Sequence, residues 1–179
     1  MRERALHAHI VYRQADADAL SEAGVQGLIL ALNDDLNQGD LDHSLEDWVA
    51  KRAQAGDVER YADTLAKLRS TDGEYSWVIW AGPEFDQQRF VAFMMSVIPD
   101  LLESGQPLRV VNLAQNPAQA GADAIRSATP VEIEDMQVRM AANVWQCIVD
   151  GMPIPAAELA RMVEEQMPAF TQAMIAWAE

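Results

Sequence analysis

The sequence predicts an α/β fold in which helices and a mostly parallel sheet of about four strands form three layers, followed by an α-helical tail. Four short apolar segments of strand length recur between residues 6 and 113, and helical patterns separate them. Strands that alternate with helices are typical of βαβ units, which form parallel sheets. Beyond residue 129 only helical patterns remain. We therefore expect an α/β domain at residues 1–115, a linker or loop at 116–128 and a helical extension at 129–179.

The four predicted strands are apolar, β-branched or aromatic segments that end at polar residues or at glycine. They span residues 6–12, 28–32, 75–81 and 108–113. The second is apolar throughout, as expected of a strand that is covered on both faces. The third stops at Gly82 and Pro83, which are typical strand breakers.

Helix signals fall between these strands. Asp16 or Asp18 is the expected cap of a first helix, and Gly24 ends it. Further helical patterns span residues 44–55, 58–70 and 84–103. In the last of these, Pro99 should kink the helix or divide it in two, because proline removes a backbone donor.

The helical extension is predicted to begin at a cap signature. Thr129 suits the N-cap, Pro130 the first helical position and Glu132 the third position after the cap. We expect this helix to run to about Val149, and two shorter helices to follow on either side of Pro168.

The charge of the chain restricts its partners. The 179 residues include 28 Asp and Glu against 13 Lys and Arg, a formal net charge of -15. Nucleic acid and anionic membranes attract basic surfaces, so neither is an expected ligand. A basic protein partner is expected instead, with a metal ion or solubility alone as the alternatives. No apolar segment reaches the ~18 residues of a membrane helix, and the single cysteine permits no internal disulfide, so we expect a cytoplasmic protein.

Polar residues at the carboxyl ends of the predicted strands form the candidate site. Nine acidic residues and no Lys or Arg occur between Asp16 and Ala50, and Asn33-Asp34-Asp35 directly follows the second strand. Ligands of parallel α/β sheets bind at the carboxyl ends of the strands. The candidate residues of this rim are Arg13, Gln14, Asp34, Asp35, Glu84, Asp86 and Asn112. No residue is assigned a catalytic role.

Cofactor signals are weak, and no cofactor is predicted. Arg13-Gln14 stands where a dinucleotide-binding glycine motif would follow the first strand, and no Walker loop is present. Residues 35–46 have acids at calcium-loop positions, but Asp40 replaces the required glycine. His7 and His9 lie two apart on one strand face, where imidazoles can bind a metal ion. One alternative is therefore a divalent metal held by His9, Asp34 and Asp35, and the other is a histidine hydrogen-bonded to backbone.

Two further residues have alternative interpretations. Cys147 lies in an apolar helical segment, where a buried thiol packs far more often than it reacts. Four of the tryptophans fall at core positions, whereas Trp177 near the end of the chain is a candidate partner anchor.

Short motifs resemble an uncharacterised bacterial domain-of-unknown-function family. They are His9-Ile10-Val11, the helix that ends at Leu20, Asp34-Asp35-Leu36 with Gly39, and Trp80-Ala81-Gly82-Pro83-Glu84-Phe85-Asp86. The chain has Arg13-Gln14 where that family has Gly-Asp, and Gly39-Asp40 where Gly-Pro is usual. The resemblance implies a Rossmann-like N-terminal domain with a small helical C-terminal extension, and it implies no reaction.

Two functional hypotheses follow from the sequence. The first is a non-enzymatic protein-binding module, similar to an immunity protein or antitoxin, whose acidic face engages a basic protein. The second is a Rossmann-like enzyme or small-ligand binder with a carboxylate-lined, metal-dependent site at the strand carboxyl ends. The oligomeric state is left open.

Overall fold

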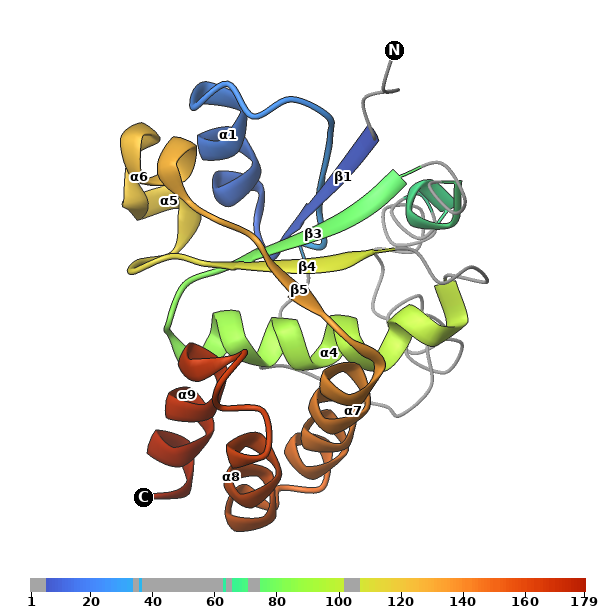
Figure 1. Ribbon diagram of the computed structural model, residues 1–179, viewed down its shortest axis with the longest axis vertical. Helices are drawn as coiled ribbons and strands as arrows, with labels where there is room; N and C mark the ends of the chain where they lie inside the picture. The colour runs from blue at the N-terminus through green and yellow to red at the C-terminus, as the bar shows by residue number, and fades with distance from the viewer. Residues whose placement is uncertain (1–5, 34–35, 37–62, 64–65, 71–74, 102–106) are drawn as a thin grey trace.

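The protein forms a central sheet with helices on both faces (Figure 1). Its computed structural model describes residues 6–33, 36, 63, 66–70, 75–101 and 107–179. The predicted helix at 44–55, most of the one at 58–70, and Asp34 and Asp35 lie outside the described residues; residue 63 and residues 66–70 are helical. In the described part of the chain, no helix has the length and apolar character needed to cross a membrane.

The sheet is mostly parallel, which confirms the predicted fold class. Its strands are β1 (Leu6–Val11), β2 (Leu28–Ala31), β3 (Tyr75–Ala81), β4 (Leu108–Asn112) and β5 (Val131–Ile133). They lie in the order β2-β1-β3-β4-β5. The first four are parallel to their neighbours, and β5 is antiparallel to β4. The four strands predicted from the apolar segments are all present, within a residue or so of their expected ends.

The fifth strand corrects the prediction that a helix begins at Thr129. Val131 pairs with Val110, and Ile133 pairs with Leu108. The helix begins at Asp135 instead, where Glu134 is the N-cap and its backbone N–H donates to Gln137 Oε1 at 3.1 Å. A three-residue strand is too short to show a period-two pattern in the sequence, and only its pairing with β4 defines it.

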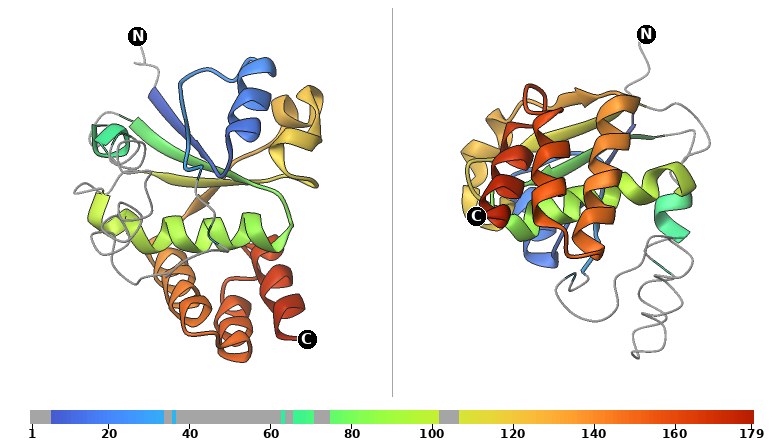
Figure 2. Two further views of the ribbon diagram at one scale, coloured as in Figure 1. Left: turned by 180° about the vertical axis from the view of Figure 1, so that it is seen from behind. Right: turned by 90° about the horizontal axis from the view of Figure 1, so that it is seen from below.

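One face of the sheet is covered by two successive layers of helices (Figures 1 and 2). Helix α4 (Phe85–Leu101) packs directly on the sheet, and α7 (Asp135–Val149) and α9 (Pro168–Ala178) pack on α4. Helix α8 (Pro153–Arg161) lies against α7 and α9. The helical extension therefore packs in cis on the α/β domain.

The central position of α4 explains its composition. Residues 90–95 are all almost completely buried, so this helix is apolar around its whole circumference rather than along one stripe. Burial of each large apolar side chain contributes roughly 1.5–3 kcal/mol. Helix α4 runs through Pro99 without being divided, in contrast to one of the two outcomes expected from the sequence.

On the other face, the helices of the described residues are short. They are α1 (Gln14–Glu22), α5 (Pro117–Ala120) and α6 (Ala122–Ser127). Segment 116–128, expected as a linker or loop, thus contains two helices. Helix α1 begins earlier than predicted: Arg13 is its N-cap, Asp16 is its third residue, and Gly24 follows its end with a φ of 80°. Asp16 does not cap α1 but reaches back to the Arg13 backbone N–H.

Candidate functional site

Asp16 lies at the centre of the predicted rim. Its carboxylate accepts hydrogen bonds from the backbone N–H of Arg13 (3.3 Å), from Gln87 Nε2 (3.2 Å) and from the backbone N–H of Ala118 (3.0 Å). These donors belong to the starts of α1, α4 and α5, so one buried carboxylate joins three elements. It also occupies N–H groups that a bound phosphate would otherwise use.

The structure brings several predicted rim residues into pairs. Asn33 Nδ2 lies 3.4 Å from Gln14 Oε1, where the ends of β1 and β2 meet. Asn112 Oδ1, at the end of β4, is 3.5 Å from Gln88 Nε2. The carboxyl ends of neighbouring strands therefore do converge.

The four acidic residues expected at this rim differ in their surroundings: one forms an ion pair, one is exposed, and two lie outside the described residues. Asp86 forms an ion pair of 3.0 Å with Arg89, one turn along α4. Glu84 is exposed. Asp34 and Asp35 lie outside the described residues, so their contribution to the rim stays a prediction. Among the described residues, no group of three or more His, Cys, Asp and Glu is arranged to hold a metal ion.

The sequence reasoning missed a buried polar cluster at the start of α4. Gln87 Oε1, Gln88 Oε1 and Arg89 Nε are buried and lack a hydrogen-bond partner within the part of the chain that the structure describes. The signal was the run Gln87-Gln88-Arg89 at the beginning of an otherwise apolar helix. Gln88 also links the helix start to the end of β3, since its Nε2 donates to the Gly82 carbonyl at 2.6 Å.

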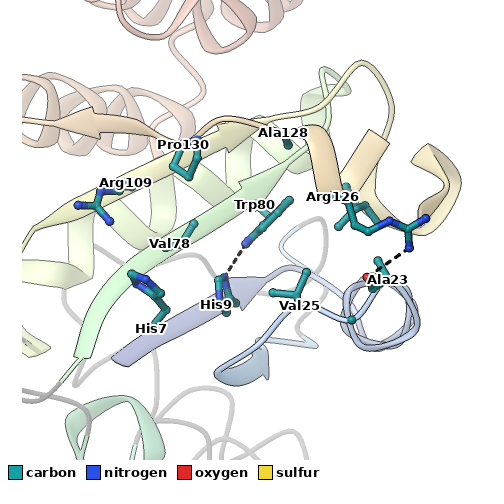
Figure 3. Close-up of a pocket in the computed structure, with 12 residues that line it drawn as sticks. His7, His9, Ala23, Val25, Val78, Trp80, Arg109, Arg126, Ala128 and Pro130 are labelled. Carbon is teal, nitrogen blue, oxygen red and sulfur yellow. Dashed lines mark hydrogen bonds between the residues drawn. The ribbon is translucent and has the colours of Figure 1, made fainter. Parts of the chain in front are cut away.

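A separate pocket of about 320 Å³ lies on the α1, α5 and α6 face of the sheet (Figure 3). Its lining comes from β1, β3, β4, the end of α1 and the segment from α6 to β5. The lining residues are His7, His9, Ala23, Gly24, Val25, Val78, Trp80, Arg109, Ile125, Arg126, Ala128 and Pro130. It therefore lies over the sheet face and not at the strand carboxyl ends, where the sequence placed the site.

His9 forms the floor of this pocket as a neutral imidazole. Its Nδ1 accepts a hydrogen bond of 3.0 Å from Trp80 Nε1, and its Nε2 donates one of 3.1 Å to the Gln26 carbonyl. An indole N–H can only donate, so these partners fix the proton of His9 on Nε2. Burial lowers the pKa of His9 from its usual 6.5, with the neighbouring His7 adding to the effect and the Gln26 bond opposing it.

This arrangement matches the expectation of a histidine bonded to backbone. Both ring nitrogens are engaged, so His9 could bind a metal only after losing the bond to Trp80 or the bond to Gln26. His7 shares the same strand face, as predicted, and its ring centroid is 5.9 Å from that of His9. His7 Nδ1 is 2.6 Å from Ser76 Oγ.

Two arginines lie at the edge of the pocket. Arg109 projects from the middle of β4, opposite Val78 on one side and Glu132 on the other. Arg126 comes from α6, where its guanidinium pairs with Asp123 and donates to the Ala23 carbonyl at 3.4 Å. Sequence reasoning missed Arg109, although a lone charged residue inside an apolar strand is a usable signal.

The helical extension exposes apolar side chains in acidic surroundings. Ile154 on α8 is 64% exposed, and Met162 at the end of α8 is 60% exposed. Met152, just before α8, is 40% exposed. Residues 134–179 contain seven carboxylates, all exposed, against two arginines. Ile154, Glu158 and Arg161 line a shallow hollow of about 240 Å³ between α8 and α9.

Two other expectations concern single residues. Cys147 is buried in α7, and its pKa is raised by burial and by the charge of Asp150, which is consistent with the expected packing role. Trp177, the candidate partner anchor, instead packs on Phe85 of α4 with ring centroids 5.3 Å apart. It therefore helps to hold α9 in place.

Comparisons with known proteins leave the family open. No protein-family model matches the chain, and no curated protein matches it. The resemblance to a bacterial domain-of-unknown-function family therefore stays a prediction.

Proposed function

We propose that the protein is a cytoplasmic, non-enzymatic binding protein that engages a basic protein partner through the exposed surface of α8. This surface consists of Met152, Ile154 and Met162 with the neighbouring carboxylates Glu158 and Glu164. The observation that carries the proposal is the exposure of these large apolar side chains within the acidic helical extension.

The composition of the α8 surface favours a protein over a small ligand. Apolar side chains that are more than half exposed supply area that a partner can remove from water, at roughly 25 cal/mol per Å². Methionine adapts to different partner shapes because its side chain is unbranched and flexible. Carboxylates around such a centre attract a partner that carries Lys and Arg, and repel acidic proteins.

The state of the described rim gives less support to a carboxylate-based enzyme. Asp16 has its oxygens bonded to three protein donors, and Asp86 is paired with Arg89. A general base or metal ligand would have to give up these bonds. The rim hypothesis now depends on Glu84, which is exposed, and on Asp34 and Asp35, and it stays a prediction.

A pull-down from the native host with the purified chain as bait tests the proposal. Bound proteins are compared at about 50 mM and about 500 mM NaCl, because salt screens exposed charges. The candidate partner is then purified and titrated against the wild type and against Ile154→Ser with Met162→Ser. We expect the double variant to bind at least about tenfold more weakly, since it removes apolar area from the contact. Met136→Ser, on an exposed apolar residue at the start of α7, is the matched control and should bind as the wild type does.

A second pair of variants separates the effect of carboxylates at the α8 surface from the effect of the net charge of the chain. Glu158→Gln with Glu164→Gln removes two carboxylates from the α8 surface, whereas Asp18→Asn with Glu22→Gln removes two exposed carboxylates from α1. We expect the first pair alone to weaken binding, by roughly 0.2–1 kcal/mol for each charge. The proposal would be contradicted by a partner that binds the two α8 double variants as tightly as the two control variants. It would also be contradicted by a partner whose binding does not depend on salt.

A further inference from the structure

We propose that the pocket over the β1, β3 and β4 face binds a small organic anion, with its charged group at Arg109 and Arg126 and its apolar part against Val78 and Trp80. This site is separate from the α8 surface and lies on the opposite side of the sheet.

The charge of the pocket is opposite to that of the chain. The protein has 28 acidic and 13 basic residues, yet the described lining holds two arginines, two histidines and no carboxylate. A cationic concavity on a protein of net charge -15 selects an anion by local contact, because the long-range field of the chain repels anions.

The guanidinium groups of Arg109 and Arg126 can both reach a ligand, but their present interactions differ. Among the described residues, no hydrogen bond or ion pair involves the side chain of Arg109, although this residue is half-buried on the sheet face. Arg126 is held in place by Asp123 and by the Ala23 carbonyl, and its side chain is still 54% exposed. A guanidinium held in this way loses little conformational freedom when it binds a carboxylate or phosphate.

Besides Asp123, which pairs with Arg126, the carboxylate of Glu132 lies beside the pocket and outside its lining. It lies directly opposite Arg109 in the antiparallel β4–β5 pair, so the two side chains share one face of the sheet. Glu132 is exposed and forms no ion pair with Arg109 in the described structure. It therefore competes with an incoming anion for Arg109, and removal of its charge should strengthen anion binding.

The volume and the walls define the class of ligand. About 320 Å³ is at the small end of the range for small-molecule sites, which suits a molecule of one or two rings. Val78, Trp80 and Ile125 supply an apolar wall, and the Trp80 indole is fixed by its bond to His9. A flat apolar body with one carboxylate or phosphate group fits this combination.

Titration of the isotope-labelled full-length chain by NMR tests the proposal with four probes. These are 2-naphthoate, 2-naphthyl phosphate, the neutral 2-naphthamide and inorganic phosphate. We expect the indole N–H signal of Trp80, assigned with Trp80→Phe, to shift with the two naphthyl anions at millimolar concentration. Naphthamide and inorganic phosphate should bind at least about tenfold more weakly, because each lacks one of the two required parts. The relative affinity of the naphthyl anions distinguishes a carboxylate ligand from a phosphate ester.

Variants test the assigned groups. Arg109→Gln should weaken 2-naphthoate at least about tenfold, and Glu132→Gln should strengthen it by about two- to fivefold. A gain of affinity cannot come from misfolding. Arg139→Gln, on an exposed arginine of α7, changes the net charge as Arg109→Gln does and should have no effect. Equal binding of naphthoate and naphthamide, unchanged affinity in Arg109→Gln, or the absence of shifts at Trp80 would each overturn the proposal.

Discussion

The strongest structural prediction concerns Asp16, whose side chain joins three elements at the rim of the sheet. Asp16→Ala leaves Gln87 Nε2, which is fully buried, without an acceptor, and it removes the partner of two backbone N–H groups that are partly buried. An unpaired buried donor costs about 1–3 kcal/mol, and water can replace part of the other two bonds. We expect Asp16→Ala to lower the free energy of unfolding by about 3 kcal/mol.

Asp16→Asn should be much milder, because Gln87 can adapt to it. Gln87 Oε1 is buried and has no hydrogen-bond partner among the described residues. If the Gln87 amide rotates by half a turn, this oxygen accepts from the new Asn side-chain NH₂, while the Asn oxygen keeps the bond from the Ala118 N–H. The Arg13 N–H then loses its acceptor, because the Asn NH₂ stands where Oδ2 was, and this sets the expected loss at about 1 kcal/mol.

Urea unfolding followed by circular dichroism measures these differences, with the slope of the transition as a check on two-state behaviour. Asp18→Ala is the control, since it removes the same charge two residues along α1 from an exposed position and should change stability by at most about 0.5 kcal/mol. If Asp16→Ala behaves as Asp18→Ala does, or if Asp16→Asn is as damaging as Asp16→Ala, the reasoning about this carboxylate is wrong.

Three further predictions concern the pocket floor and the core. The pKa of His9 is below 6.5 in the folded protein. As the pH falls through 6.5, the unfolded chain therefore binds a proton at this histidine before the folded protein does, and the free energy of unfolding falls. NMR titration should show His9 still neutral at a pH where an exposed histidine is already protonated. Gly27→Ala should destabilise the protein by about 2 kcal/mol or more in urea unfolding, because Gly27 has a φ of 132° and a Cβ would lie 2.5 Å from the His7 carbonyl oxygen; a stability equal to that of the wild type would refute this. Cys147 has a raised pKa and is buried, so the folded protein should react with a thiol reagent at least about tenfold more slowly than free cysteine, and rapid labelling would contradict that account.

Much of the fold could be predicted from the sequence because its signals are local. The strand from Leu28 is apolar throughout, and Gly24 before it ends a helix with a positive φ. The break between α8 and α9 falls where Pro168 opens a new helix. β5 gave no such signal, since three residues become a strand only through pairing with β4.

The pocket could not be predicted in the same way, because it depends on register between distant segments. His9 and Trp80 are 71 positions apart in the sequence, and their bond exists only because β1 and β3 are neighbours. Arg109 joins them through a second pairing, between β3 and β4. The rule that ligands bind at strand carboxyl ends placed the candidate site at the rim, where Asp16, Gln87 and Gln88 form internal hydrogen bonds in the described structure.

The difference in helix cover between the two faces of the sheet accounts for both proposed surfaces. On one face, the 17 residues of α4 cover the strands and are themselves covered by α7 and α9, so α8 is the outermost element and its apolar side chains meet solvent. On the other face, α1, α5 and α6 have nine, four and six residues, too few to cover the strands completely, and the pocket lies over the part that they leave.

The negative charge of the chain should couple binding at the α8 surface to binding in the pocket. A basic partner bound at α8 neutralises part of the field of a protein with net charge -15, and that field opposes entry of an anion into the pocket. Partner and anion should therefore favour each other's binding, by equal factors in both directions, because linkage is reciprocal. The coupling acts over a distance between separate surfaces, so it should vanish at high salt, where the Debye length shrinks to a few ångströms, while the direct contact of the anion with Arg109 is retained. A coupling that persists at high salt would instead require a conformational change between α8 and the sheet.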